Sequence, residues 1–444
     1  MSEHVLVVGG GLTLPGLLRT LGTNVRTSVA CQLAIVPKLL DQRAHQRILG
    51  LRAEADDQEW LDIVLAVHRI DPITRVATFG ERDQARAAAI AAELGLAMHT
   101  PQTVEWVHHK PSMRRRLAAL GLDDTAHAVV RSVAELREFL RAHGFPCIAK
   151  PAVGAGSIGI HRIDNAEDLA AALRTAGVTG EWTGGGVLVE RLHVGPQVSV
   201  EAFSDAGEHQ IVCVTQKYSD PRSHVELGHV LPAALPADQL AAIEEYVPAV
   251  LSALRIDFGP THTELVLTAD GPRIIETHTR VAGDLIPNLV LDALGVDLAE
   301  YTVRQVLGEA GLLPRLRAQL ADAAGHSRHE AVWFAASEID CLLDSVGEPA
   351  QPAEGVREVR WYRDPGDRLE RLSSSDSRFG HVRAHGDSPE QAIERARQAL
   401  NAITVKVLLP PEVAGIPREW GTDSWRTLRE IPSAVRKDLS AARP

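Results

Sequence analysis

The stretch THTELVLTADGPRIIETHTRVAGD, from Thr261 to Asp284, constrains the fold more than any other part of the sequence. Apolar and polar residues alternate on both sides of an Asp-Gly-Pro turn, which predicts a β-hairpin. Glu264 and Glu276 lie about equally far from the turn, so paired strands would place their carboxylates side by side. Adjacent carboxylates repel each other, and a bound divalent cation is the usual reason for keeping them together. An ordinary hairpin with two solvent-facing glutamates is the alternative.

An arginine lies just beyond the second strand of this hairpin. Arg280 follows Glu276 by four residues. Its guanidinium could hold a developing anion through two parallel hydrogen bonds. We therefore count Arg280 with the two carboxylates as a candidate for a catalytic role.

Composition excludes two classes of partner. The chain has 444 residues, 45% hydrophobic and 23% charged, which is typical of a globular protein of two to four domains. A formal net charge of −12 argues against nucleic acid as a partner. No apolar run approaches the roughly 20 residues of a membrane span, and the N-terminus lacks a basic region, so we expect a cytoplasmic protein. The four cysteines form no CxxC pair, and we expect buried, reduced thiols.

The first hundred residues are typical of a small α/β domain. An apolar strand over His4–Val8 leads through three glycines into a helix with leucines at helical spacing. A dinucleotide fingerprint would need a further glycine near Leu14, so we expect the glycines only to let the turn pack. Further strand and helix units are expected through Asp62–Val67, Arg75–Phe79 and the alanine-rich helix Asp83–Leu94.

A glycine-rich loop follows a strand in the segment FPCIAKPAVGAGSIGIHRI. Its glycines would let backbone N–H groups approach a polyphosphate, while Ser157 adds a hydroxyl and Lys150 supplies a cation from the strand. The Walker pattern GxxxxGK[ST] is absent from the sequence, which excludes a P-loop ATPase. A flexible glycine hairpin without a ligand fits the same residues.

Other candidates are single polar side chains beside expected strands or helices. The strand that ends at Glu190 could present one carboxylate and backbone groups to an adenine edge. A lone polar side chain in such a place is more often solvated than functional. The other candidates are Lys110 ahead of a helix, Lys217 after the strand Gln210–Thr215, and Glu226 and His229 in a loop rich in turn residues.

These segments, in this order, resemble the ATP-grasp superfamily over roughly residues 1 to 310. The pattern consists of a lysine before the central domain, KPxxGxGSxG, VExxxxGPxxSVE, and a hairpin with paired acidic residues followed by an arginine. The resemblance implies a mixed α/β (α+β) protein with the ATP-grasp fold and a Rossmann-like N-terminal domain. The implied parts are an N-terminal domain at 1–105, a central lid region at 106–203, a catalytic region at 204–324, a C-terminal ligase subdomain at 325–407 with a helix from Ser388, and a poorly ordered tail at 408–444.

Within that superfamily, the segments GPTHTELVL, IETHTRVAGDLIP and VELGH resemble the L-amino-acid ligases and related carboxylate-amine ligases. That resemblance implies that ATP phosphorylates a carboxylate and an amine displaces the phosphate, with ADP as the other product. It implies Mg²⁺, or Mn²⁺, at Glu264 and Glu276, and Arg280 against the acyl phosphate. The implied ATP contacts are Lys110, Lys150, Ser157, Glu190, the backbone at Leu192, Gln197 and Lys217, and the implied substrate contacts are Glu226, His229 and Asp284.

Three residues qualify the resemblance. Gln197 stands where many relatives have a ribose-binding glutamate, although an amide can still accept a hydroxyl's proton. His278 replaces an asparagine that commonly completes the metal site, so it is left out of the metal set. Asp284 would border the carboxylate pocket, or else cap the segment through Ile286 and Pro287.

Two other functions fit the same scaffold. One is a biotin-carboxylase-like or purine-pathway enzyme, against which VELGH and THTRVAGD argue. The other is a nucleotide-binding regulator with a dead site, which would predict the loss of a metal carboxylate or of Arg280. The expected partners are small-molecule carboxylate and amine substrates, with neither nucleic acid nor membrane, and a homodimer is left open.

Overall fold

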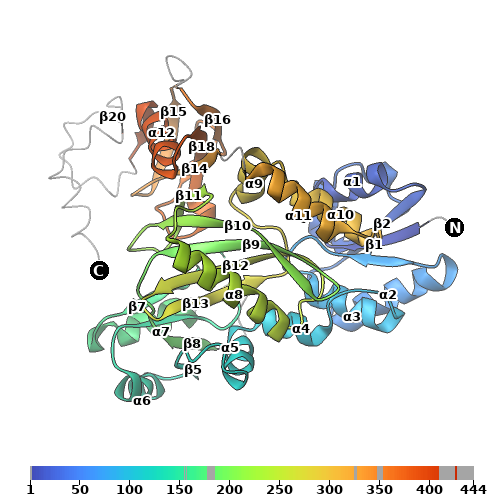
Figure 1. Cartoon of the computed structure of the whole chain (residues 1–444), viewed down its shortest axis with the longest axis horizontal. Helices are drawn as coiled ribbons and strands as arrows, with labels where there is room; N and C mark the ends of the chain where they lie inside the picture. The colour runs from blue at the N-terminus through green and yellow to red at the C-terminus, as the bar shows by residue number, and fades with distance from the viewer. Residues whose placement is uncertain are drawn as a thin grey trace. The chain divides into compact units, whose positions relative to one another are not determined.

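The computed structural model describes residues 3–154, 156, 158–177, 186–324, 328–347, 354–409 and 426–427. The chain divides into two compact units (Figure 1). Unit 1 comprises residues 1–153, 161–215 and 235–326, and unit 2 comprises residues 154–160, 216–234 and 327–444. The five-part division expected from the sequence stays a prediction.

Unit 1 begins with the expected α/β domain. Its parallel sheet has the order β3-β2-β1-β4. The segment Asp62–Val67 lies inside helix α2, which starts at a capping box between Asp56 and Glu59. Ala-rich α3 packs against β1 and β4 and ends at a left-handed Gly95. The elements are β1 (Glu3–Val8), α1 (Leu14–Leu21), β2 (Val25–Gln32), β3 (Arg47–Leu51), α2 (Asp57–Ile70), β4 (Arg75–Ala77) and α3 (Gln84–Leu94).

A second, antiparallel sheet of unit 1 carries the predicted phosphate lysine. Its order is β5-β8-β6-β7, and Lys150 lies on β6 as predicted. Helix α6 begins where Ser132 accepts a hydrogen bond from the backbone N–H of Glu135. The elements are α4 (Pro101–His108), α5 (Lys110–Ala119), β5 (His127–Val130), α6 (Val133–His143), β6 (Cys147–Pro151), β7 (His161–Ile163), α7 (Leu169–Gly177) and β8 (Val187–Arg191).

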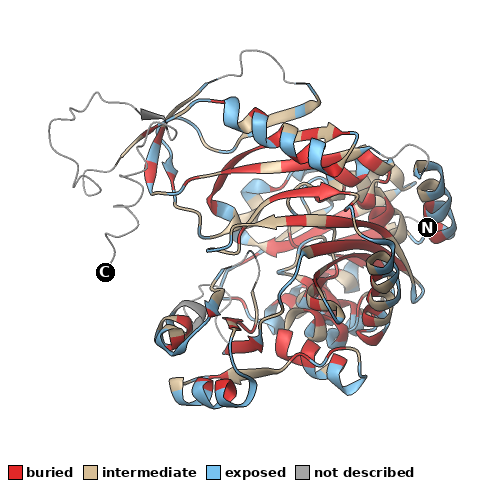
Figure 2. Cartoon of the chain, turned by 60° about the vertical axis from the view of Figure 1, so that its left-hand side comes forward, coloured by how far each residue is buried: buried red, intermediate tan, exposed pale blue. Residues whose placement is uncertain are grey.

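The predicted hairpin forms the third part of unit 1. Strands β13, β12 and β9 pair antiparallel, and α8 packs against β13 (Figure 1). Figure 2 shows these strands largely buried, while the helices keep an exposed face. The elements are β9 (Gln197–Asp205), β10 (Glu208–Ser219), α8 (Ala237–Ala253), β12 (Gly259–Thr268), β13 (Gly271–His278), α9 (Ile286–Leu294), α10 (Leu298–Val306) and α11 (Leu312–Ala323).

Unit 2 is built on antiparallel strands in the order β11-β14-β18-β16, with helix α12 packed against β14 and β18. As predicted, α12 follows Ser388, whose hydroxyl accepts from the backbone N–H of Gln391. A smaller sheet has the order β17-β15-β19-β20. The elements are β11 (Glu226–Leu231), β14 (His329–Ala336), β15 (Cys341–Val346), β16 (Val356–Trp361), β17 (Arg368–Leu369), β18 (Arg378–Gly386), α12 (Pro389–Ala402), β19 (Val405–Leu408) and β20 (Arg426–Thr427).

Two local predictions were wrong. Lys217 lies inside β10, which runs on to Ser219, and not after its end. Glu226 and His229 lie on strand β11, not in a loop. The turn-forming residues around them are overridden because β11 pairs with β10 on one side and β14 on the other, and each pairing satisfies backbone groups.

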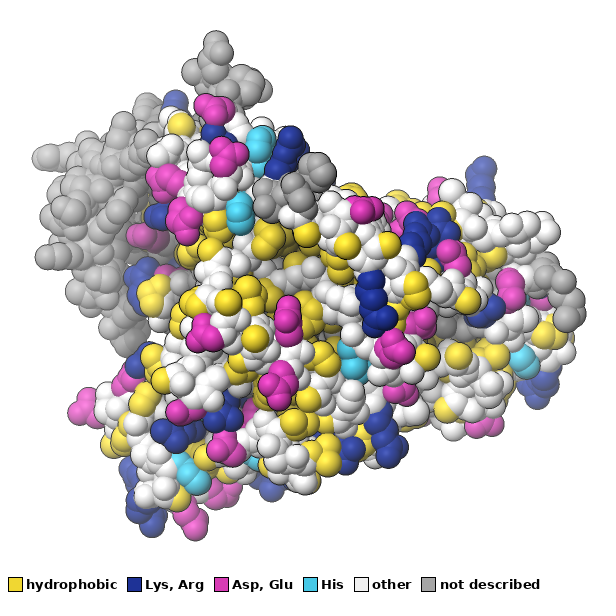
Figure 3. Space-filling view, viewed as in Figure 1, with side chains coloured by type: hydrophobic (Ala, Val, Ile, Leu, Met, Phe, Trp, Pro, Cys, Tyr) yellow, Lys and Arg dark blue, Asp and Glu magenta, His cyan; other side chains and the backbone are white. Residues whose placement is uncertain are grey.

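Three predictions from composition can be compared with the structure. All four cysteines are buried free thiols, as predicted, and burial raises the pKa of Cys31 and of Cys147 to about 11. Acidic and basic side chains are interspersed on the face drawn in Figure 3. Among the described residues, no helix is long and apolar enough to span a membrane.

Candidate active site

The hairpin places the two predicted carboxylates directly opposite each other. Glu264 on β12 pairs with Glu276 on β13, with a bulge after Glu264. Residues two apart on a strand share a face, so His262 lies on the side of Glu264 and His278 on the side of Glu276. On the opposite face, a hydrogen bond of 2.8 Å between two buried threonine hydroxyls joins the strands. Each glutamate side chain is 16% exposed, so both carboxylates border solvent.

Lys110 and His278 hold the second carboxylate between them. The Lys110 Nζ lies 2.8 Å from Oε2 of Glu276, and His278 Nε2 lies 3.2 Å from Oε1. Lys110 comes to this position as the first residue of α5. Burial would raise the pKa of Glu276, but Lys110 and His278 hold it well below its ordinary value. Burial would likewise lower the pKa of Lys110, yet Glu276 raises it, so the pair stays charged.

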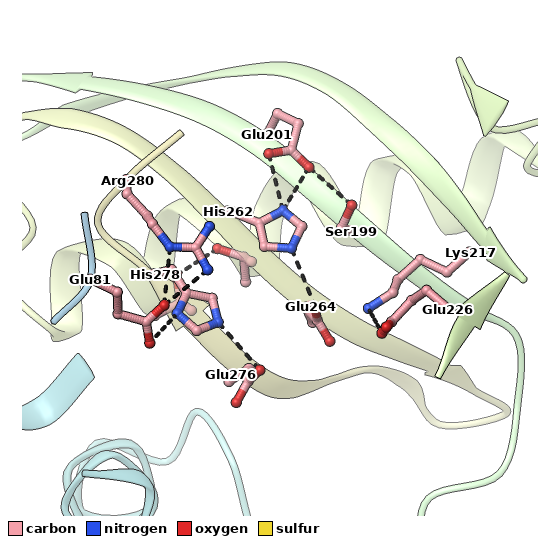
Figure 4. Close-up of polar contacts among 12 residues, drawn as sticks. Glu81, Ser199, Glu201, Lys217, Glu226, His262, Glu264, Glu276, His278 and Arg280 are labelled. Carbon is pink, nitrogen blue, oxygen red and sulfur yellow. Dashed lines mark hydrogen bonds and ion pairs between the residues drawn. The ribbon is translucent and has the colours of Figure 1, made fainter. Parts of the chain in front are cut away.

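Arg280 is held by Glu81, a carboxylate that the sequence reasoning missed. The Nε and Nη2 of Arg280 donate to Oε2 of Glu81 at 3.0 and 2.9 Å (Figure 4). Oε1 of the same carboxylate lies 3.2 Å from His278 Nδ1. Burial raises the pKa of Glu81, but His278 and Arg280 outweigh it and lower that pKa well below the ordinary value. Glu81 lies between β4 and α3, about two hundred residues before Arg280, and no local signal identifies it.

His262 links the first carboxylate to a third one on β9. Its Nδ1 lies 2.9 Å from Glu201 Oε1, and its Nε2 lies 3.3 Å from Glu264 Oε1. Glu201 is fully buried and also accepts from the Ser199 hydroxyl at 2.9 Å. Burial lowers the pKa of His262, but Glu201 and Glu264 raise it to about 10. The spacing of His262 two residues before Glu264 was a signal in the sequence that could have placed it here.

Lys150 and Glu190 meet in a buried cluster with Arg114. Lys150 Nζ lies 2.6 Å from Glu190 Oε2, and Arg114 Nε donates to Glu190 Oε1 at 2.6 Å. Burial raises the pKa of Glu190, but Arg114 and Lys150 lower it well below the ordinary value. Burial lowers the pKa of Lys150 despite Glu190. Both oxygens of Glu190 thus contact cations of the protein, and its contact with adenine stays a prediction.

Three further predicted ATP residues lie near this cluster in sequence. The backbone N–H of Leu192 donates to the Pro146 carbonyl at 3.2 Å, and Gln197 begins β9. Ser157 lies outside the described residues. Their roles toward ATP stay predictions.

In unit 2, Lys217 and Glu226 form an ion pair of 3.1 Å between β10 and β11 (Figure 4). His229 pairs with Lys217 across the same strands and is 1% exposed. The Phe334 ring lies edge-on to His229 and under the Arg378 guanidinium, which also donates to the Glu226 carbonyl. The structure therefore places Glu226 and His229 among close polar and aromatic neighbours.

Asp284 lies in the bend after Arg280. It and Leu285 both have left-handed backbone, and Leu285 is the N-cap of α9. Leu285 itself has no side-chain oxygen with which to cap the helix, and Asp284 immediately precedes it. The pocket role and the capping role considered for Asp284 both stay predictions.

The donor set at Glu264 and Glu276 fits a magnesium ion that also binds phosphate. No cluster of three or more His, Cys, Asp or Glu side chains in the described part of the chain could hold a metal by itself. Mg²⁺ is commonly bound by one or two carboxylates together with waters and substrate phosphates, so two carboxylates at a solvent border are sufficient.

Comparisons with known families agree with this architecture. Residues 143–288 match the ATP-grasp domain family. The chain carries an ATP-grasp domain. Residues 343–408 of this ATP-grasp chain match the L-amino acid ligase C-terminal domain 2. The mixed α/β fold and the resemblance to L-amino-acid ligases are thereby confirmed.

Individual proteins give the same picture. An L-amino acid ligase from Bacillus licheniformis has the same fold, with a TM-score of 0.75 and 20% identity over 91% of this chain and 98% of that one. Dapdiamide A synthase of Enterobacter agglomerans is 24% identical over 63% of this chain and 67% of its own length. An uncharacterized protein of Sinorhizobium fredii is 28% identical over 84% of this chain and 76% of its own length.

Proposed function

We propose that this ATP-grasp chain is a ligase that joins an amino acid, or another small carboxylate, to an amine through an acyl phosphate. The observation that carries the proposal is the pair Glu264 and Glu276, set opposite each other beside Lys110 and Arg280. Two carboxylates at the solvent border suit an Mg²⁺ ion, or Mn²⁺ in its place, which would offset the negative charge of ATP phosphates.

In the proposed reaction, a carboxylate oxygen attacks the γ-phosphorus of ATP and ADP leaves. The amine nitrogen then attacks the acyl carbon, and phosphate leaves with the oxygen that came from the carboxylate. Lys110 and Lys150 would contact the phosphates as ammonium groups, and Arg280 would steady the negative charge of the acyl phosphate. Glu81 orients the guanidinium of Arg280 by accepting hydrogen bonds from two of its nitrogens.

The remaining roles in the proposal rest on the resemblance. We assign ATP contacts to Ser157, Glu190, Leu192, Gln197 and Lys217, and substrate contacts to Glu226, His229 and Asp284. A cytoplasmic location and the choice of metal belong to the same proposal.

The C-terminal match supports an amino-acid ligase over the other readings. A domain found in L-amino acid ligases spans residues 343–408, and dapdiamide A synthase is among the relatives. Glu264, Glu276 and Arg280 are all present, so the loss that a dead regulator would predict is not found.

The test is a screen of carboxylate and amine pairs for release of ADP. ADP release should require a carboxylate, and amide formation should require both partners. With an ¹⁸O-labelled carboxylate, one labelled oxygen should appear in the released phosphate. Release of AMP and pyrophosphate, or phosphate without the label, would exclude the acyl-phosphate route. Glu276→Gln serves as the inactive control, since it keeps the shape but removes one metal-binding charge.

A further inference from the structure

The sequence around the two metal carboxylates is a mirror image of itself. Thr-His-Thr-Glu runs toward the turn from Thr261, and Glu-Thr-His-Thr runs away from it to Thr279. The pairing register preserves this symmetry, because His262 lies opposite His278 and Glu264 lies opposite Glu276. The two imidazole rings are stacked with their centroids 6.0 Å apart.

Each histidine lies between two carboxylates. The Nε2 of each ring points to the glutamate two residues away on its own strand, at 3.3 Å for Glu264 and 3.2 Å for Glu276. The Nδ1 of each ring points to a carboxylate from a different element, Glu201 on β9 at 2.9 Å and Glu81 at 3.2 Å. Both histidines are less than 10% exposed, so packing holds each ring in place (Figure 4).

We propose that His262 and His278 are positioning residues that fix the orientation of Glu264 and Glu276, and that neither histidine binds the metal. This inference rests on the metal site of the proposed function. A ring nitrogen that binds a metal must direct a lone pair at it, whereas both nitrogens of both rings lie 2.9–3.3 Å from carboxylate oxygens. For the Nδ1 of His278 this is an ion-pair contact with Glu81 and not a hydrogen bond of good geometry. The arrangement leaves only oxygen donors from the hairpin for the ion, which is the set that Mg²⁺ and Mn²⁺ prefer.

The carboxylates of Glu201 and Glu81 explain why histidine is suited to positions 262 and 278. A histidine between two carboxylates bridges them, so Glu201 and Glu81 hold the rings while the rings hold the metal carboxylates. The two donors of an asparagine are on one nitrogen, whereas the two nitrogens of an imidazole ring lie on different sides of the ring. Glu81 contacts both His278 and Arg280, so its one carboxylate orients the imidazole ring and the guanidinium group.

The test is binding of Mn²⁺ to the protein with saturating ADP, followed by electron paramagnetic resonance. His262→Leu and His278→Leu fill the space without a donor and should weaken Mn²⁺ about tenfold to a hundredfold, as is usual for groups that orient metal ligands. His262→Gln should recover part of the loss, because its amide can still donate to Glu264. The control is His99→Gln, at a buried histidine stacked on Phe258 whose pKa is lowered by burial and by no neighbouring carboxylate; this variant should leave Mn²⁺ affinity unchanged.

The same samples decide between positioning and direct ligation. Electron spin echo measurements on the wild-type Mn²⁺ complex should show no directly coordinated ¹⁴N. A ¹⁴N coupling that disappears in His278→Leu would overturn the inference, as would Mn²⁺ affinities unchanged in both leucine variants. If Glu276→Gln also left Mn²⁺ binding intact, the metal site of the proposed function itself would be wrong. If that variant lost Mn²⁺ while the histidine variants kept it, only the inference about the histidines would fail.

Discussion

The position of the Arg280 side chain is fixed by the carboxylate of Glu81, which is distant in the sequence. Two of its nitrogens donate to the same oxygen of Glu81, and a third donates to the Val281 carbonyl at 3.1 Å. These three bonds hold the guanidinium plane in one orientation at the end of β13. A planar group held in this way can present its edge to an anion, which a flexible ammonium cannot do.

We expect Arg280→Lys to lower kcat on the order of tenfold to a thousandfold, because a point charge cannot reproduce paired hydrogen bonds to a developing oxyanion. Steady-state kinetics with a carboxylate and amine pair found in the screen would measure the change in kcat. Arg273→Lys is the matched control on the preceding strand β13, since Arg273 pairs only with the exposed Asp124 at 3.2 Å among its ion pairs in the described residues. Near-normal turnover of Arg280→Lys would reduce Arg280 to a structural role.

At the scale of elements, one buried arginine ties helix α5 to two sheets. Arg114 on α5 donates to Glu190 on β8, to the Ile274 carbonyl on β13 at 2.7 Å, and to Asp123 at 3.1 Å. Burial lowers the pKa of Arg114, but Glu190 and Asp123 raise it above the ordinary value. The helix that carries Lys110 is thereby fixed to the strand that carries Glu276.

We expect Arg114→Met to lower the free energy of unfolding by about 3–5 kcal/mol, because it leaves buried carboxylates without a partner. Urea denaturation measures the change. Arg115→Met, on the exposed side of the same helix, should change stability by less than about 0.5 kcal/mol. Equal losses in the two variants would show that the buried ion cluster is not what anchors α5.

For the molecule as a whole, buried neutral histidines make the free energy of unfolding depend on pH below neutrality. Burial lowers the pKa of His99 to about 4, and burial also lowers the pKa of His108 to about 4 despite Glu81. Their unfolded pKa is about 6.5. Between these values the unfolded chain binds more protons than the folded protein, so stability falls as pH falls from about 6.5 to 4.

We expect His99→Phe to reduce this pH dependence by about 1.2 kcal/mol between pH 5.0 and 6.0, because nearly one more proton is bound to the unfolded histidine than to the folded one over this interval. Phenylalanine keeps the stack on Phe258, where the rings lie 4.1 Å apart. Unfolding free energies at pH 5.0 and 6.0 would measure the slope, with His143→Phe as a control at an exposed histidine. An unchanged slope would show that His99 does not become charged on unfolding in this range.

Local sequence was sufficient for features governed by neighbours in the chain. The alternating pattern on both sides of a turn predicted the hairpin and its two facing carboxylates, and both are confirmed. The turn itself was placed wrongly, because Thr268 pairs with Gly271 and the chain therefore turns at Ala269–Asp270. The bulge after Glu264 then brings Glu276, and not Ile275, opposite Glu264. The start of α12 after Ser388 was predicted from the resemblance of this segment to the ligase subdomain, and a local cap, in which Ser388 accepts from the backbone N–H of Gln391, explains it. The ATP-grasp fold was predicted from several such local patterns in a fixed order.

Only the tertiary structure decided which side chains from distant parts of the sequence contact the hairpin and the helices. Three charged residues contact the hairpin or Arg280 from 61 to 199 residues away in the sequence: Glu81, Glu201 and Arg114. No sequence pattern near the hairpin predicts these contacts. Strand β11 was predicted as a loop because its hydrogen bonds come from β10 and β14, not from its own residues. A buried charge is stable only beside a partner, and which partner is available depends on how the chain packs, not on which residues are adjacent in the sequence.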